Sequence, residues 1–403
     1  MIPSLQYLDR YRNEGTRTYS KHSAYTEAKE LYRPNASQKN FIVNAFAIPR
    51  QDLLIYTANP PQELSVSYLG KKKALFCIHP QVLEEYTTDP YVQAVIKTSK
   101  SRRKIEVIPS SSTRTLYVKS AFPHAIKLHF PFRVSRYNRK MRDEVIEQAV
   151  NVSRDMEYGI DNFDPTFAYL REVIGISYAN LNTSSSRGEN WGYLIRDMRP
   201  FPVCREKRAL IPGFALYGKD FFTAEQAPLL YSLIDAADPV ELILGRIMLP
   251  IIHHWVQCFS TFGYMLEPHG QNVLLELDDE QNITRIVHRD LSVGIDMRRR
   301  QDLQISSTHL NQYNRMDYGQ FLSIAYDMFM GSHFFDRIVA CCREKFPGLT
   351  DEDFRKPCRL TFEKIFPEHR NYFPATIHYF SEQRDRYNKP LYKDTGKKPQ
   401  WRP

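Results

Sequence analysis

Short runs in which apolar and polar residues alternate moderately occupy the first third of the chain. β-Branched and aromatic residues are frequent in these runs, and Pro109 and the lysines at 71–73 punctuate them. Alternation of this kind over about four to eight residues is typical of half-buried β-strands. The pattern predicts strands at 41–47, 53–58, 74–78, 104–108, 116–118 and 125–130.

Beyond residue 140 the apolar residues recur with the period of a helix. Val145, Ile146 and Val150 follow the spacing of an amphipathic helix. Asp238 and Pro239 predict a second helix start, because they combine an N-cap residue with a proline in the first turn.

The longest apolar stretch, 240–266, contains charged and amide side chains together with two histidines. Because these groups are costly in a bilayer, the stretch predicts a buried amphipathic helix rather than a membrane span. Residues 273–277 and 283–287 then predict a β-hairpin over an acidic turn. After residue 313 we expect a mainly helical chain with a frayed end at 394–403.

This order of elements favours an α+β fold, because strands come first and helices second instead of alternating. We place the boundary near residue 140. Residues 1–140 then form a sheet-rich portion, and residues 141–403 form a mainly helical portion that contains one hairpin.

The composition is that of a folded, globular protein. Of 403 residues, 42% are apolar and 13% are aromatic, which is enough to bury a sizeable core. The net charge is +9, but the basic residues are scattered and no recognition motif for nucleic acid accompanies them. A polyanionic small molecule such as a nucleotide suits a positive excess of this size equally well.

The six cysteines form no C-x-x-C pair, so the sequence carries no zinc-ribbon or redox signature. The first residues lack the basic, apolar and small-residue order of a signal peptide. We therefore expect a cytoplasmic protein without a membrane partner.

Two polar segments of the sheet-rich portion carry donors for phosphate groups. Ser112, Arg114 and Thr115 lie in a run of serines and threonines between two predicted strands. Hydroxyls, backbone N–H groups and a guanidinium are the donors that phosphate oxygens need. Lys127 follows on the next predicted strand, in a basic run that ends at Arg139. The competing interpretations are a polar surface turn and a solvated strand face.

The helical portion contributes two further segments. Glu267, His269 and Asn272 lie between the long apolar helix and a predicted strand. Functional side chains are frequent in such loops because rigid elements hold them in place. Asp290 follows the next predicted strand, where a carboxylate can bind Mg²⁺ together with substrate phosphates. A structural turn and an Arg289–Asp290 ion pair are the competing interpretations.

Other catalytic motifs fail their own requirements. Residues 288–291 read His-Arg-Asp-Leu like a kinase catalytic loop, but the position that needs Asn holds Ile295. A glycine-rich phosphate loop, a G-x-S-x-G elbow and an H-E-x-x-H helix are all absent from the sequence. The adjacent His253 and His254 point about 100° apart on a helix, so we expect one in the core and one at the surface.

Taken together, the segments resemble the motifs of the NRPS-independent siderophore synthetases of the aerobactin-synthetase type. That family shows H-P-W-Q, S-x-R-T, K-L, T-x-x-x-R, E-x-H-G-Q-N and R-D elements in this order. The six-residue E-P-H-G-Q-N match is the most specific, and a segment ending at Arg196 is also similar. The counterparts in this chain lie at 79–81, 112–115, 127–128, 135–139, 267–272 and 289–290.

The resemblance implies a cupped-hand fold, with 1–140 as the fingers-like portion and 141–403 as the palm- and thumb-like portion. It implies an ATP-dependent ligase of siderophore biosynthesis that uses Mg²⁺. Such an enzyme adenylates a carboxylate, citrate or a citrate derivative, and condenses it with an amine or hydroxyl. Members of the family are often homodimers.

The matched motifs also imply a role for each candidate residue. Arg139 and His269 would meet the α-phosphate and the carboxylate substrate as catalytic residues. Glu267 and Asp290 would bind Mg²⁺. The nucleotide and its phosphates would be contacted by Ser112, Arg114, Thr115, Lys127, Glu267, Asn272 and Asp290.

Three departures from the family pattern bear on activity. The region that normally precedes the family's Y-x-P-E element is almost wholly missing, Gln81 follows Pro80 where the family has Trp, and Ser135 replaces Thr. The expected outcomes are a compact active synthetase, a subunit that needs a partner, or a degenerate paralogue that binds nucleotide or carboxylate. A kinase-like phosphotransferase acting on a small molecule is a further alternative.

Overall fold

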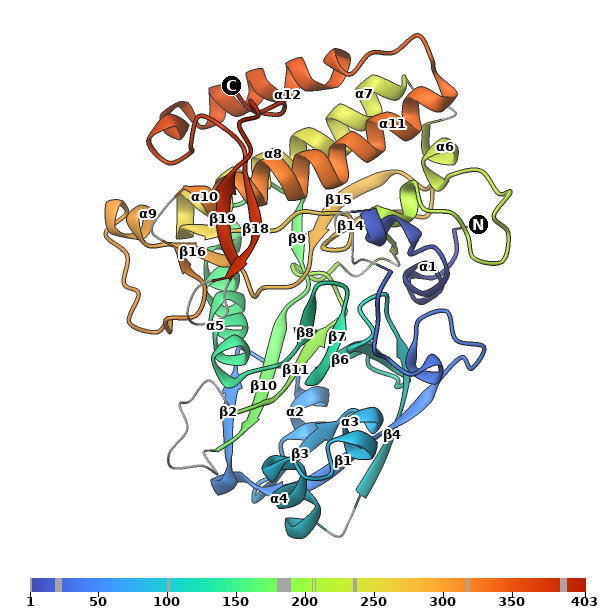
Figure 1. Ribbon diagram of the computed structural model, residues 1–403, viewed down its shortest axis with the longest axis vertical. Helices are drawn as coiled ribbons and strands as arrows, with labels where there is room; N and C mark the ends of the chain where they lie inside the picture. The colour runs from blue at the N-terminus through green and yellow to red at the C-terminus, as the bar shows by residue number, and fades with distance from the viewer. Residues whose placement is uncertain are drawn as a thin grey trace.

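The computed structural model describes residues 2–18, 24–99, 102–179, 190–204, 206, 208–234, 238–316, 319–384 and 390–403. A sheet-rich part and a helix-rich part lie one below the other in Figure 1. Each part buries its own apolar core, with Phe46 and Tyr193 fully buried in the first and Trp255 and Tyr326 in the second. The expected α+β fold class is confirmed.

The larger sheet has eight strands in the order β2-β10-β11-β6-β5-β4-β1-β3. The strands predicted at 41–47, 53–58, 74–78, 104–108 and 116–118 are confirmed. Thr115 pairs with Lys127 across β5 and β6, which places the S-x-R-T segment beside the lysine. The strands are β1 (Phe41–Pro49), β2 (Leu53–Thr57), β3 (Lys73–Ile78), β4 (Arg102–Pro109), β5 (Thr115–Val118), β6 (His124–Leu128), β10 (Glu172–Tyr178) and β11 (Gly192–Asp197).

Two strands of this sheet, β10 and β11, lie beyond residue 140, where the sequence pattern predicts helices. Every residue of both strands is buried. A strand covered on both faces loses the alternation by which a strand is recognised. The helix α5 (Asp143–Gly159) packs on β10, at the place where the helical period predicts a helix. The division of the chain near residue 140 stays a prediction.

The run predicted at 125–130 divides into two strands. β6 stays in the large sheet, whereas β7 (Phe130–Val134) forms a separate hairpin with β8 (Tyr137–Arg139). Ser135 in the turn has a φ of 60°, which lets the chain reverse tightly. Three short helices accompany the large sheet: α2 (Gln62–Tyr68), α3 (Pro80–Glu85) and α4 (Pro90–Thr98).

The helix-rich part contains a four-stranded sheet in the order β12-β14-β15-β9. The predicted hairpin is confirmed as the antiparallel pair β14–β15. The strands are β9 (Phe167–Tyr169), β12 (Ala209–Pro212), β14 (Val273–Leu277) and β15 (Ile283–His288), and a small sheet holds β13 (Tyr264–Met265), β16 (Gly294–Asp296) and β17 (Arg315–Met316). The shorter helices and the two C-terminal ones are α6 (Leu229–Ile234), α9 (Met297–Asp302), α10 (Gln320–Ser323), α11 (Asp336–Lys345) and α12 (Glu352–Ile365).

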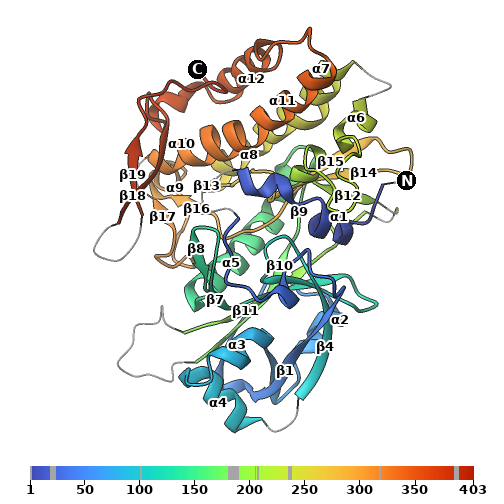
Figure 2. The ribbon, with the colours of Figure 1, turned by 45° about the vertical axis from the view of Figure 1, so that its right-hand side comes forward.

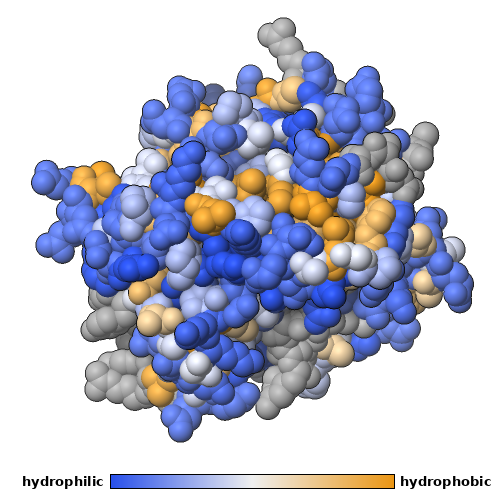
Figure 3. Space-filling model, turned by 90° about the horizontal axis from the view of Figure 1, so that it is seen from above, coloured by the Kyte–Doolittle hydropathy of each residue, from blue (hydrophilic) through white to orange (hydrophobic). Residues whose placement is uncertain are grey.

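The predicted helix start at Asp238 is confirmed, because its carboxylate accepts hydrogen bonds from the N–H groups of Val240 and Glu241. α7 (Pro239–Ile243) continues through a π-helical turn into α8 (Leu249–Phe262). By length and composition this helix could cross a membrane, but 56% of its most apolar window is buried inside the protein. Figure 3 shows the molecule from above, and this face of the helix-rich part is mainly hydrophilic with a few apolar patches.

Both ends of the chain pack against other elements. α1 (Leu5–Tyr11) lies beside β12, between the helix-rich and sheet-rich parts (Figures 1 and 2). The prediction of a frayed end at 394–403 is wrong, since Trp401 and Arg402 are only 1% and 3% exposed. A hairpin of β18 (His378–Arg384) and β19 (Pro390–Asp394) precedes them. The sequence does not indicate that Trp401 and Arg402 are buried, because they form no periodic pattern.

Candidate active site

The S-x-R-T segment forms a folded loop between β4 and β5. The Ser112 hydroxyl oxygen accepts a hydrogen bond from the Thr115 N–H at 3.2 Å and lies 3.0 Å from that of Ser110. Thr113 has a φ of 68°, which is unusual for a β-branched residue and indicates backbone strain. Thr113 and Thr115 are also buried, so the alternative of a plain surface turn is wrong.

Lys127 and Asp290 form an ion pair across the two parts of the molecule. The Nζ–Oδ1 distance is 2.6 Å, and the Lys127 side chain is 2% exposed while that of Asp290 is 32% exposed. The lysine therefore lies on a buried strand rather than on a solvated strand face. Asp290 has a φ of 74°, a second strained position. Asp290 pairs with Lys127, and Arg289 pairs with Asp9, so the competing Arg289–Asp290 pair is wrong.

Arg114 and Arg139 add further positive charge beside this pair. The Arg114 Nη1 donates to the Arg139 carbonyl oxygen at 3.2 Å and to the Lys140 carbonyl oxygen at 3.3 Å. Burial, and next the Arg139 charge, lower the pKa of Arg114 to about 10. Burial also lowers the pKa of Lys127, against the opposing effect of Asp290.

The Asp290 carboxylate stays ionised in these surroundings. Burial by itself would raise its pKa, but Lys127, Arg196 and Arg114 outweigh burial and hold the pKa well below its usual range. Arg196 is itself paired with the buried Glu172, at 2.6 Å between Nη2 and Oε1. The site thus carries more positive than negative charge around one accessible carboxylate.

Glu267 and His269 are neutral near pH 7. Burial, with the Asp290 charge adding to it, raises the pKa of Glu267 to about 8. Burial lowers the pKa of His269 to about 4, although Asp290 favours the charged form. The His269 Nδ1 accepts a hydrogen bond from the Gln271 N–H at 3.2 Å, and the ring meets the edge of Phe329. The site therefore combines an ionised acid, a protonated acid and an uncharged imidazole.

The nine predicted site residues are brought together to different degrees. The charges of Arg114, Lys127, Arg139 and Asp290 perturb one another or Glu267 and His269, which places these six residues near one another. Ser112 acts within its loop, and Thr115 is the cross-strand partner of Lys127. Asn272 links the loops through its backbone, since its carbonyl oxygen accepts from the Arg289 N–H at 2.9 Å.

Several residues in or beside the site belong to no motif or pattern that would single them out in the sequence. Asp9 lies in a polar N-terminal stretch, and Glu172 lies in a strand without alternation. Tyr313 lies close to Arg114 and Glu267, because both charges act on its pKa, which burial raises. Arg196 ends a segment that the motif comparison points to, but its partner Glu172 becomes visible only when β10 and β11 pair.

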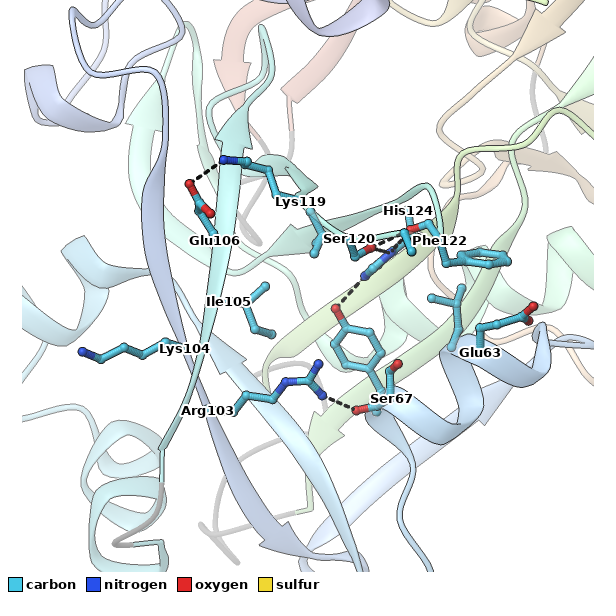
Figure 4. Close-up of a pocket in the computed structure, with 14 residues that line it drawn as sticks. Glu63, Ser67, Arg103, Lys104, Ile105, Glu106, Lys119, Ser120, Phe122 and His124 are labelled. Carbon is cyan, nitrogen blue, oxygen red and sulfur yellow. Dashed lines mark hydrogen bonds and ion pairs between the residues drawn. The ribbon is translucent and has the colours of Figure 1, made fainter. Parts of the chain in front are cut away.

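A cavity of about 320 Å³ lies elsewhere, between α2 and strands β4 to β6 (Figure 4). The Tyr68 hydroxyl lies 2.7 Å from the His124 Nε2, and Arg103 donates to the Ser67 carbonyl oxygen at 3.1 Å. These polar groups thus have partners, and none of the nine predicted residues lines the cavity. His124 belongs to the predicted basic run, but it lies on the opposite strand face from Lys127.

The donor set limits which metal could bind. Among the described residues, no group of three or more His, Cys, Asp or Glu side chains could hold a metal ion. Glu267 and Asp290 would therefore supply at most two carboxylates, and other ligands would have to come from the substrate and water. Mg²⁺ is commonly bound in this way, through one or two carboxylates and substrate phosphates.

A comparison with protein families matches residues 19–217, about half of the chain, to the model of the IucA / IucC family. Over this region the chain belongs to the IucA / IucC family. The matched residues include the S-x-R-T segment, Lys127 and Arg139. The segments around Glu267 and Asp290 lie outside the match, so the structure alone connects them to it. No curated protein matches the sequence significantly.

Solved structures of low sequence identity share the fold of this chain. The petrobactin biosynthesis protein AsbB from Bacillus anthracis str. Sterne has a TM-score of 0.68 at 15% identity, over 95% of this chain and 71% of that one. The ATP-bound aerobactin synthetase IucA from Klebsiella pneumoniae has a TM-score of 0.64 at 14% identity, over 87% and 66%. The aerobactin synthetase IucC has 0.63 at 15%, over 88% and 67%. The expected synthetase-like fold is therefore confirmed.

Proposed function

We propose that this family member is an ATP-dependent siderophore synthetase. It would adenylate a carboxylate, citrate or a citrate derivative, with release of pyrophosphate. An amine or hydroxyl would then attack the acyl-adenylate and displace AMP, giving an amide or ester. The observation that carries the proposal is the cluster in which Arg114, Lys127 and Arg139 lie near one ionised and one protonated acid.

The charge in this cluster suits the first step, the attack of the carboxylate on ATP. A carboxylate that attacks the α-phosphate brings two anions together, and they repel each other unless cations neutralise them and hold them in line. We assign Arg114 and Lys127, with the Ser112–Thr115 loop, to the nucleotide phosphates. Arg139 and the neutral His269 are assigned to the α-phosphate and the carboxylate that meets it.

Glu267 and Asp290 are assigned to Mg²⁺, and Asn272 to the nucleotide. Two observations support the fit of Mg²⁺ to this site. The Asp290 carboxylate is partly exposed, and the described residues supply two candidate carboxylates and no larger group of metal ligands. A bound cation favours the ionised form of Glu267 and, when present, neutralises phosphate charge. A cytoplasmic location and a homodimeric state stay predictions.

The experiment that tests the proposal measures pyrophosphate release from ATP and Mg²⁺, with hydroxylamine as a generic acceptor. Citrate is tried first, and then other di- and tricarboxylic acids. Acid-dependent release with AMP as the nucleotide product supports adenylation. ADP as the product would favour a small-molecule phosphotransferase instead. Folded protein that binds ATP but releases nothing with any acid would favour a degenerate or partner-dependent chain.

A further inference from the structure

Asp9 of α1 is fully buried between the two parts of the molecule. Its carboxylate accepts a two-pronged ion pair from Arg289, with Nη1–Oδ2 and Nη2–Oδ1 both at 3.1 Å. The Ser111 hydroxyl donates to Oδ1 at 3.1 Å, and the Tyr117 hydroxyl donates to Oδ2. A helix that contains no predicted site residue therefore holds three side chains from two distant regions of the chain, 111–117 and Arg289.

These contacts close a ring of hydrogen bonds that links three segments of the candidate site. Arg289 Nε donates to the Gln271 carbonyl oxygen at 2.6 Å, and the Gln271 side-chain amide donates to the Ser111 hydroxyl at 3.2 Å. Ser111 belongs to the S-x-R-T loop, Gln271 to the E-x-H-G-Q-N loop, and Arg289 to the R-D segment. Asp9 binds two of these three directly, together with Tyr117 on β5.

The ring adjoins the two strained residues of the site. Thr113 lies two residues after Ser111, and Asp290 follows Arg289, with φ values of 68° and 74°. Such conformations persist only where the surroundings over-determine them. Asp9 also supplies the counter-charge for Arg289, which is 7% exposed. A buried guanidinium without that carboxylate would be drawn to the neighbouring Asp290, in competition with Lys127.

We propose that Asp9 is a positioning residue, which orients the S-x-R-T loop and Asp290 together through Ser111 and Arg289. The inference rests on the proposed function for its kinetic consequence, but not for its structural one. Residues that orient a site in this indirect way commonly change affinity or activity by about 10–100-fold when they are altered.

The test compares Asp9→Asn with two matched variants. Asp327→Asn removes one charge from another buried Asp–Arg pair. This pair joins Asp327 to Arg402 and lies outside the three linked segments. Asp220→Asn loosens α1 itself, because Asp220 contacts Tyr7 and Arg12 but none of the ring residues in the structure. Each folded variant is assayed for the KM for ATP and for kcat of pyrophosphate release, and for hydrogen exchange of its backbone amides.

We expect Asp9→Asn to raise the KM for ATP and lower kcat/KM about 10–100-fold. Hydrogen exchange should rise in 110–115, 267–272 and 288–291 together, whereas both matched variants keep the wild-type KM and the exchange of these segments. If Asp9→Asn does not fold, Tyr117→Phe, which removes one donor to the same carboxylate, should shift both readouts in the same direction by less.

Unchanged KM and unchanged exchange in Asp9→Asn would overturn the inference, and so would an equal effect of Asp220→Asn. A wild-type protein that releases no pyrophosphate would count against the proposed function alone. In that case the exchange of the three segments still decides whether Asp9 orients them.

Discussion

Two aspartates of this molecule lie beside a cation and differ in most other respects. Asp327 accepts hydrogen bonds from Arg402 at both oxygens and from the Ser323 hydroxyl at 2.7 Å, and both partners of the pair are almost fully buried. Asp290 has one contact of 2.6 Å with Lys127, is 32% exposed, and has a strained backbone. The Asp327–Arg402 pair is therefore buried and balanced in charge, whereas the Asp290–Lys127 pair is partly exposed to solvent.

The pKa values of the two aspartates shift in opposite directions. Burial raises the pKa of Asp327 in spite of Arg402. At Asp290 the charges of Lys127, Arg196 and Arg114 outweigh burial and lower the pKa. An accessible carboxylate amid surplus positive charge is poorly suited to stabilising a fold and well suited to binding an anion and a divalent cation. The ion pair at the end of the chain shows what a purely structural pair looks like in the same protein.

The largest expected effect separates the two pairs by mutation. Lys127→Met should lower the rate of pyrophosphate release about 10²–10³-fold, because it removes a donor for developing phosphate charge. Its free energy of unfolding should fall by less than that of Arg402→Met, since water reaches the Asp290 carboxylate and Arg114 and Arg196 remain close to it. Arg402→Met should instead cost about 3–5 kcal/mol, because it leaves the Asp327 carboxylate buried without a counter-charge.

Urea denaturation and the pyrophosphate assay, both done on the same preparations, measure these effects. Folded Arg402→Met should release pyrophosphate at a rate within about twofold of wild type, because the Arg402–Asp327 pair lies outside the loops of the candidate site. A large loss of stability in Lys127→Met, or a large loss of rate in folded Arg402→Met, would contradict the distinction between the two pairs.

A smaller effect should appear in the stability of the protein when the pH is lowered. Buried His129 stacks on Trp191, and its Nδ1 accepts from the Met141 N–H at 3.2 Å. Burial lowers the pKa of His129 to about 3, so folding favours the neutral form. Its contribution to stability is complete above about pH 6.5 and declines as the pH falls toward 3, by at most about 1.4 kcal/mol per pH unit.

His129→Gln replaces this group with an amide that does not titrate. The free energy of unfolding, measured from pH 4 to pH 8, should therefore fall less steeply below pH 6.5 than it does in wild type. Between pH 7 and pH 8, where His129 is mainly uncharged in both the folded and the unfolded protein, the two slopes should coincide, which provides the control. The same slope in His129→Gln and wild type would exclude His129 as a source of acid sensitivity.

The sequence predicts well those structural features that depend on residues adjacent in the chain. The helix start at Asp238 and the hairpin β14–β15 follow from neighbouring residues, and the candidate segments stand out by composition. The partners of these segments do not follow, because Lys127 and Asp290 are joined only when distant strands and loops fold together. Asp9 and Glu172 escape notice for the same reason, and β10 escapes because burial of both faces removes its alternation.

The smallest expected effect tests whether backbone strain belongs to the site. Thr113 and Gln281 have the same φ of 68°, but Thr113 is buried in the S-x-R-T loop and Gln281 is exposed in the β14–β15 turn. Glycine relieves a left-handed conformation that costs other residues about 1–2 kcal/mol. Gln281→Gly should therefore stabilise the protein by about 1 kcal/mol and leave pyrophosphate release unchanged.

Thr113→Gly should relieve the same strain but also free the loop that holds Ser112 and Arg114. Its stability should stay within about 1 kcal/mol of wild type, while pyrophosphate release falls several-fold because the donors are less well oriented. Thermal unfolding and steady-state kinetics of the two variants give the comparison directly. Equal rates in both variants would mean that the strain at Thr113 is a feature of the fold, as it is at Gln281, and not part of the site.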